Sequence, residues 1–460
     1  MLSTFGCDRA SPPPPPPPKP MVEVLRDQSR TTRAFEWVRS LCDDVGARMS
    51  GSPGDARAVA WAQAKMSELG LSNVRAERVI VPTWRRNAES ARIVQPTEQA
   101  LAVTALGGSV ATPEGGLDAE VVMVPDLAAL DKLAIEAVRG KIVFIDTETK
   151  ATKDGSGYGA AVPARRDGPV AAAKLGASAV VIRSIATSGA RLPHTGAVDY
   201  KPEIPAIPAA ALSVPDAAML HRLVDRGKVT MHLELGCRRE ADVASANVVG
   251  EVIGRELPDQ IVVVGAHLDS WDLGTGAQDD GAGVAIALEV GRMIQAMPVH
   301  PRRTIRVVLF ANEENGVRGG LEYARLHEPE LSHHFAATEL DLGAGKVWGV
   351  TYLTAPGNDE PMQQLLSPMR PLGVQSIKEA TWSGADISPL RYRGVPVFEL
   401  AQDATHYFDV HHSADDTLDK IDPKALDQAV RAAAVLVYGV ADLDRDLGRV
   451  PDDKRGNKWW

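Results

Sequence analysis

From residue 245 onward, short apolar runs alternate with segments of helical periodicity, and this alternation constrains the fold more than any other feature. We expect strands at 260–266, 304–311, 335–342 and 395–400, helices at 282–297 and 319–327, and a closing helix at 423–443. Such alternation predicts an α/β fold with a mostly parallel mixed sheet that helices flank. Sheets of this kind place their ligand-binding and catalytic sites at the carboxyl ends of the strands.

The N-terminal part of the chain predicts one more helix and strand of the same α/β domain. Ser52 and Pro53 suit the N-cap and the first position of a helix that Gly70 ends. A strand is expected at 74–81, closed by Pro82.

Residues 117–240 have a different pattern of expected strands and helices. Short β runs at 121–124, 141–146, 179–183 and 229–235 alternate with short helical stretches and Gly/Pro turns, without a cluster of His, Asp and Glu. We therefore predict a small β-rich insert at 117–240. It would interrupt a discontinuous main domain, 21–116 and 241–460, and a disordered proline-rich tail would occupy 1–20.

The N-terminal tail carries a targeting hypothesis. A short apolar patch ends at Cys7, and the proline tract 12–18 that follows is typical of a stiff polyproline II spacer. One interpretation is an exported protein, periplasmic, extracellular or lipid-anchored through Cys7; the other is a disordered tail with an incidental cysteine. No complete signal peptide is present in this sequence to decide between them.

Charge and cysteine usage narrow the function classes. The 50 Lys and Arg residues against 60 Asp and Glu give a net charge of -10, which argues against a nucleic-acid partner. No apolar run reaches the roughly 20 residues that span a bilayer. Cys7, Cys42 and Cys237 are too far apart for a CxxC metal site, and Cys42 and Cys237 are expected to be buried. Any metal must therefore be held by His, Asp and Glu.

Polar side chains gather where the expected strands end or the next helix begins. His267 and Asp269 lie two residues apart, so both point to one face of a strand end, where one can bind a metal and the other orient it. Asp279 and Asp280 precede a glycine-rich helix start, where a carboxylate can bridge two cations or cap the helix. Asp280 is expected to support the turn.

Three later segments add to this set. Glu313 and Glu314 follow a strand, where one glutamate can ligate a metal while the other accepts a proton from water. Asp341 follows the next strand, and three histidines precede the last helix: His406, His411 and His412. Each motif alone is typical of an acidic turn, a helix cap or an incidental His pair. In this order together, they favour a site with nitrogen and oxygen ligands that suit zinc.

The ordered motifs GAHLDSWD, GAQDDGAG, ANEENG, ELDLGAG and HHSADDT resemble those of the co-catalytic zinc aminopeptidase superfamily. The segments VRGKIVFIDTE and GPVAAAKLGASAVVIRS resemble the protease-associated domain, which would be the insert. SWDLGTGAQDDGAG, LPHTGAVDY and YFDVHHSADDTLDKIDP are most similar to the plasma glutamate carboxypeptidase family within that superfamily. The resemblance covers residues 36–444.

The resemblance implies a two-zinc site. Asp279 would bridge the ions, Glu313 would be the general base, and Asp269 would orient His267. His412 is preferred to His411 because Ser413 follows it directly, as in the family pattern. Asp386 falls where relatives carry a further site residue, but a helix cap explains it equally well. The implied ligands of two Zn²⁺ ions are His267, Asp279, Glu314, Asp341 and His412.

The implied activity is that of a zinc-dependent exopeptidase that hydrolyses dipeptides or short unblocked peptides with metal-activated water. The family name indicates carboxypeptidase activity, whereas its site is of aminopeptidase type, so the polarity of cleavage stays open. Relatives are often homodimers, although no feature of this sequence requires it. Two alternatives remain: a single-zinc glutaminyl cyclase-like acyltransferase, and a non-catalytic binding protein on the same fold.

Overall fold

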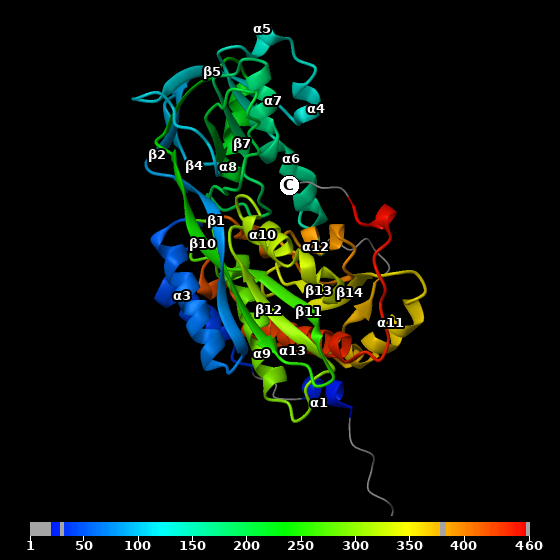
Figure 1. Ribbon diagram of the computed structural model, residues 1–460. Coiled ribbons are helices and arrows are strands. Elements are labelled where there is room, and N and C mark those ends of the chain that lie inside the picture. The colour runs from blue at the N-terminus through cyan, green and yellow to red at the C-terminus, as the bar shows by residue number, and fades with distance from the viewer. Residues whose placement is uncertain (1–19, 28–31, 378–382, 457–460) are drawn as a thin grey trace, which may run out of the picture.

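The computed structural model describes residues 20–27, 32–377 and 383–456, and these form two lobes (Figure 1). The first lobe comprises the described residues of 20–85 and 238–456, and the second lobe comprises residues 86–237. Each lobe is built on a mixed eight-stranded sheet in the described part of the chain. Cys7 and the proline tract lie outside the described residues, so the targeting hypothesis stays a prediction.

The first lobe contains the predicted α/β sheet. Its central strands β12, β11, β13 and β16 are parallel neighbours, and the outer strands β1, β10 and β14 pair in antiparallel fashion. The central strands are therefore parallel where the polar clusters were expected, and the edge strand β15 is also parallel to β14. In sheet order the strands are β1 (Ser72–Arg85), β10 (Arg238–Val252), β12 (Arg303–Phe310), β11 (Leu257–His267), β13 (His334–Glu339), β16 (Val397–Gln402), β14 (Val347–Leu353) and β15 (Gln375–Ser376).

Helices cover both faces of this sheet, as predicted. Along β11, Val262 and Val264 point to one hydrophobic core, while Ile261 and Val263 point to the other. Burial on both faces explains why the strand is apolar throughout instead of alternating. On one face lie α2 (Ala34–Ser40), α3 (Pro53–Glu68), α9 (Ala282–Gln295) and α13 (Pro423–Asp442); on the other lie α10 (Arg318–Leu326) and α12 (Ser388–Tyr392). Against α13 pack α1 (Met21–Asp27) and α11 (Asp359–Leu366).

The second lobe begins earlier than the predicted boundary at residue 117. Strands β2, β3 and β4 belong to its sheet, because β2 pairs with β9 and β4 pairs with β8, each more than 100 residues later. The sequence could not reveal such long-range pairing. In sheet order the strands are β3 (Gln99–Leu101), β2 (Glu89–Gln95), β9 (Thr230–Leu235), β5 (Leu117–Val124), β6 (Ile142–Ile145), β7 (Ala179–Arg183), β8 (Ala209–Leu212) and β4 (Val103–Ala105). Its helices are α4 (Leu127–Leu130), α5 (Ile135–Val138), α6 (Ser156–Arg166), α7 (Gly168–Lys174) and α8 (Val214–Val224).

Two long antiparallel strands, β1 and β10, lead from one lobe to the other (Figure 1). Pro82 does not close β1 as expected: the strand continues to Arg85, with a shift in register between Val81 and Thr83. Proline donates no hydrogen bond, and such an irregularity accommodates it within a strand. The helix start was predicted correctly, since Ser52 caps α3 by accepting the Asp55 N–H at 3.1 Å.

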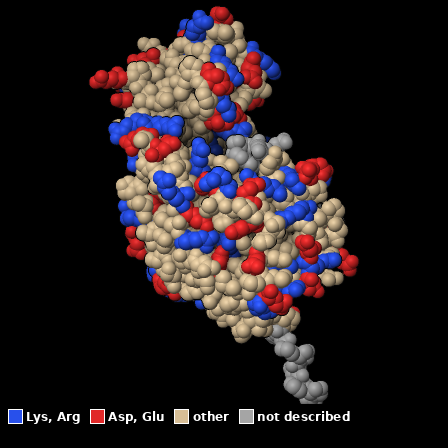
Figure 2. All heavy atoms as spheres, viewed as in Figure 1, with Lys and Arg blue, Asp and Glu red and all other residues tan. Residues whose placement is uncertain are grey.

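The surface narrows between the two lobes, and acidic and basic side chains are mixed over the face shown (Figure 2). Neither sign of charge forms an extended patch there. None of the helices in the described ranges is long and apolar enough to cross a membrane.

Candidate metal centre

Polar side chains converge at one edge of the first-lobe sheet, because its parallel central strands all end there. His267 is the last residue of β11, and Asp279 lies in the short turn η2 (Ala277–Gly281) before α9. Glu313 and Glu314 follow β12, and Asp341 follows β13. His411 and His412 follow the turn η5 (Tyr407–Asp409). Contacts described below link all the predicted ligands into one cluster.

The first group of side chains is His267, Asp279 and Asp341. The His267 Nε2 atom lies 3.1 Å from Asp279 Oδ1 and 3.4 Å from Asp341 Oδ1. One ligand atom from each residue lies close enough to the others for a single metal ion to bind all three.

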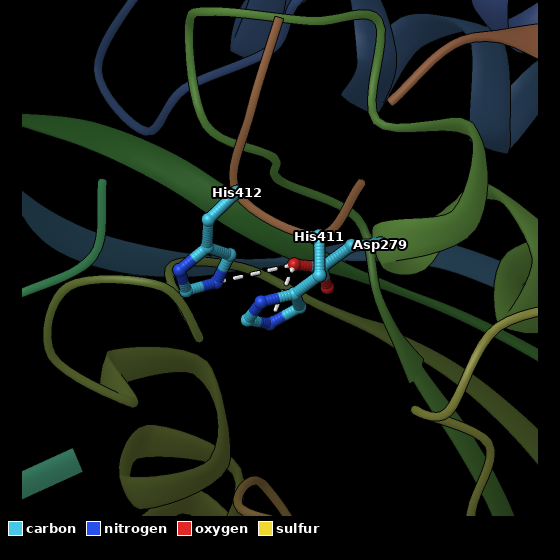
Figure 3. A group of neighbouring side chains, drawn as sticks. All are labelled: Asp279, His411 and His412. Carbon is cyan, nitrogen blue, oxygen red and sulfur yellow. Dashed lines mark ion pairs between the residues drawn. The ribbon is translucent and has the colours of Figure 1, made fainter. Parts of the chain in front are cut away.

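The second group shares Asp279 with the first (Figure 3). Asp279 Oδ2 lies 3.3 Å from His411 Nε2 and 3.2 Å from His412 Nε2. Glu314 Oε2 is 3.0 Å from His412 Nε2. The two oxygens of Asp279 therefore face different groups, which is the geometry of a bridging carboxylate.

The donor set fits divalent cations. Asp279 Oδ2 and Glu314 Oε1 are buried and accept no hydrogen bond from the described residues. Within the same ranges, no Lys or Arg lies at ion-pair distance from Asp279, Glu314 or Asp341. Imidazole nitrogen and carboxylate oxygen are ligands that zinc accepts readily. A divalent cation would compensate the negative charge of these buried carboxylates.

The mutual influence of these groups appears in their pKa values. Burial alone would lower the pKa of His267, but the carboxylates of Asp341, Asp269 and Asp279 raise it well above its ordinary value. Burial raises the pKa of Glu314 to about 7, with a further contribution from the negative charge of Asp279. For Glu313, desolvation and the negative charges of Asp341 and Glu314 raise the carboxyl pKa well above its ordinary value.

Two buried carboxylates fix the backbone of this cluster. Asp280 accepts the N–H groups of His267 and Gly283, both at 3.0 Å, and so ties the end of β11 to the start of α9. Asp416 accepts the N–H groups of Gln278 at 2.7 Å and Asp279 at 3.1 Å. Asp280 thus lies in the supporting position expected of it, whereas Asp416 was not expected to act here.

Asp269 connects two predicted site residues in a way that the sequence did not reveal. The nearest group to His267 Nδ1 is the backbone carbonyl of Asp269, at 3.1 Å, while the Asp269 carboxylate lies 3.7 Å away. That carboxylate accepts the Ser50 hydroxyl at 2.8 Å and the Glu313 N–H at 3.0 Å. The same residue therefore holds the ring of His267 and the backbone of Glu313.

One further histidine, one further carboxylate and two cysteines lie outside these two groups. His406 is exposed and its Nδ1 atom lies 2.9 Å from Asp409 Oδ2, so it lies outside both groups. Asp386 is buried and accepts the Gly320 N–H at 3.0 Å, before α12. Cys42 and Cys237 are buried free thiols, as expected.

Sequence reasoning missed two kinds of contributor. Arg48 is fully buried and donates to the carbonyl groups of Leu268, Thr275 and Gly276, at 2.6, 2.6 and 2.9 Å. Thr195, in the second lobe, bonds to His412. Thr195 lies in the segment LPHTGAVDY that carried the family resemblance, but neither residue lies in a periodic segment or an acidic motif, so nothing local indicated these contacts.

The chain was compared with known proteins. Residues 247–437 match the sequence model of Peptidase family M28. Carboxypeptidase Q of Mus musculus is 37% identical over 418 residues, which cover 91% of this chain and 87% of that protein. The Homo sapiens protein of the same name is 36% identical, again over 91% of this chain and 87% of its own length.

Solved structures of peptidases are also similar to this chain. A peptidase M28 precursor from Shewanella amazonensis SB2B is 44% identical, with a TM-score of 0.92 over 94% of this chain and 98% of its own. A zinc aminopeptidase from Bacillus subtilis has a TM-score of 0.64 at 20% identity, over 90% of this chain and 98% of that one. The second likeness shows a shared fold.

Proposed function

Because the chain belongs to peptidase family M28 and is a metallo-exopeptidase, we propose that it hydrolyses dipeptides and short unblocked peptides with two zinc ions. The observation that carries the two-ion proposal is Asp279, whose two oxygens face separate groups of ligands. We assign one zinc to His267, Asp279 and Asp341. The other would be held by Asp279, Glu314 and His412.

The choice of His412 over His411 is supported by the far side of each ring. An imidazole that binds metal through Nε2 usually donates its Nδ1 proton to a carbonyl or carboxylate. His412 Nδ1 lies 3.3 Å from the Thr195 carbonyl oxygen and 3.4 Å from Arg165 Nη1, whereas His411 Nδ1 is buried without a hydrogen-bond partner in the described residues. His267 follows the His412 pattern, with the Asp269 carbonyl at 3.1 Å.

Zinc at these positions would polarise the scissile carbonyl and lower the pKa of water from 15.7 to about 7. Glu313 is the proposed general base, which takes the proton of the attacking water and passes it to the leaving amine. Its backbone is held by Asp269, and burial together with the negative charges of Asp341 and Glu314 raises the pKa of its side chain, a direction that favours proton acceptance from water.

The test of this mechanism is Glu313→Gln, with Glu314→Gln as the matched variant. We expect E313Q to keep two zinc ions per chain and to lose about 10²- to 10⁴-fold in kcat. E314Q should instead bind the second zinc more weakly. Zinc would be measured by mass spectrometry, and turnover with a dipeptide. An E313Q protein that keeps both its zinc and the original kcat would exclude Glu313 as the base.

The polarity of cleavage is proposed to be of aminopeptidase type, with the free amine near the metals. Free, N-acetylated and C-amidated forms of one dipeptide would test this directly. The free and C-amidated forms should be cleaved, and the N-acetylated form should not. Undiminished cleavage of the N-acetylated form would contradict the proposal.

Three further expectations remain predictions. The second lobe would be a protease-associated domain, the protein would be exported, and the chain would form a homodimer. Mass spectrometry of the native N-terminus would test lipidation of Cys7. Light scattering of the purified zinc-loaded protein would test the homodimer.

A further inference from the structure

We infer that the second lobe is part of the metal centre: the loop around Thr195 positions His412, and Arg86 holds that loop against the segment that follows β11. The inference rests on the proposed function, because His412 is one of its zinc ligands. Thr195 and Arg86 are positioning residues, since they act through His412 and not on the substrate.

Thr195 and His412 contact each other through two hydrogen bonds. The Thr195 N–H donates to the His412 carbonyl at 2.9 Å, and the Thr195 carbonyl lies 3.3 Å from His412 Nδ1. His412 has a φ of 61°, in the left-handed region that residues other than glycine rarely adopt. Thr195 therefore supports both the unusual backbone of His412 and the ring orientation that turns Nε2 toward Asp279.

Arg86 is a buried side chain that joins the two lobes. It makes two hydrogen bonds to Asp272, at 2.9 and 2.7 Å, and Asp272 lies five residues after His267 in the segment that follows β11. The same guanidinium donates to the Thr195 hydroxyl at 3.3 Å and to the Ala105 carbonyl at 2.6 Å. The Thr195 hydroxyl in turn donates to Ala105 at 2.8 Å. The Arg86 guanidinium thus connects the segment that follows β11 with the loop around Thr195 that orients His412.

Trp271 makes a second connection at the same place. Its side chain belongs to the first lobe but packs into the hydrophobic core of the second lobe, against Gly107. A Cβ atom at residue 107 would lie 1.9 Å from the Trp271 ring, so the contact requires glycine there. The ring also meets His412 edge-on, with 5.6 Å between ring centroids. Two independent contacts therefore tie the same site segment to the second lobe.

The consequence is a specific effect on one of the two zinc ions. Loss of a group that orients a metal-binding histidine typically weakens metal affinity about 10- to 100-fold. The zinc held by Glu314 and His412 should be affected, whereas the zinc held by His267 and Asp341 should keep its affinity. The second lobe would then contribute to catalysis although it supplies no ligand.

The experiment uses the full-length zinc-loaded protein and four variants. Thr195→Val removes the hydroxyl at almost constant shape, and Thr195→Ser retains it. Arg86→Met removes the connecting cation. Arg183→Met is the matched control, because the Arg183 side chain is also 8% exposed and is paired with Asp146 at 2.7 Å, but within the second lobe. Zinc affinity is measured by competition with a chelator, and cobalt absorption reports the geometry of each site.

T195V and R86M keep the Thr195 backbone groups that contact His412 and remove only the side-chain contacts that hold the loop. We therefore expect the second metal ion to bind more weakly, by no more than the roughly 10- to 100-fold that loss of the orienting group itself causes, with an altered cobalt spectrum. T195S and R183M should bind both ions as the unchanged protein does. If R86M and T195V keep both affinities and merely unfold at a lower temperature, as R183M does, the inference is wrong. If the unchanged protein itself binds fewer than two zinc ions, the proposed function fails first, and the two failures are thereby distinguished.

Discussion

The two lobes place charged residues at the ends of their parallel strands in different ways. In the second lobe, Asp146 follows β6 and Arg183 ends the neighbouring β7, and the two side chains pair at 2.7 Å while almost fully buried. In the first lobe the corresponding strand ends carry His267, Glu314 and Asp341, with no Lys or Arg paired to these two carboxylates in the described residues.

This difference shows that the strand ends of an α/β sheet do not by themselves make a site. A buried carboxylate beside a guanidinium needs no further ion, because each charge compensates the other. Buried carboxylates that face only histidines and each other suit a bound cation. The electrostatic imbalance, more than the topology, distinguishes the first lobe as the place of the proposed zinc site.

The largest expected effect follows from removal of the shared carboxylate. Asp279→Asn should weaken the binding of both zinc ions and reduce kcat by at least about 10⁴-fold, because each proposed zinc site loses a charged ligand. Zinc content after dialysis and dipeptide turnover would check this. Retention of both zinc ions in D279N would show that Asp279 does not bridge them.

The corresponding change in the second lobe should affect stability only. Arg183→Met leaves Asp146 buried with His221 as its remaining partner, and breaking a buried pair costs about 3–5 kcal/mol. Chemical denaturation would measure the loss, while zinc content should stay unchanged. A loss of zinc in R183M would contradict the distinction between the lobes.

A smaller effect should appear in the pH dependence of the metal-free protein. Burial raises the pKa of Glu314 to about 7, Asp416 to about 7 and Glu339 to about 8. The unfolded chain loses these protons near pH 4, so between about pH 4 and 8 the folded state binds more protons and its stability falls as pH rises.

Zinc should oppose this loss, because it binds the deprotonated ligands. At a free zinc concentration of 100 Kd the stabilisation is about 2.7 kcal/mol, and it should shrink as the pH falls from 8 to 5.5. Thermal unfolding with zinc and with chelator at both pH values would measure this. Equal stabilisation at both would argue against carboxylate and histidine ligands.

The smallest expected effect concerns Asp386. Burial and the negative charge of Glu339 raise its carboxyl pKa well above the ordinary value, and Asn resembles Asp in shape. Asp386→Asn should change kcat by no more than about threefold, or about 0.6 kcal/mol. A larger drop, with zinc content unchanged, would assign Asp386 a direct role in the reaction.

Much of the first lobe could be predicted because its signals are local. The apolar run before His267, the cap at Ser52 and the helix at 423–443 each depend on residues within one element. Parallel strands bring their ends together by geometry, so the sequence also indicated which polar residues would meet.

The sequence by itself determined the chemistry of this protein: histidines and carboxylates at strand ends, without a cysteine to join them. Only the tertiary structure decided which groups hold those side chains in place. Arg48, Asp416 and Thr195 contact the centre from segments distant in the chain, and β2 pairs with β9 across the predicted boundary of the insert. Such contacts form between residues without a common local pattern, so they are decided only when the chain packs.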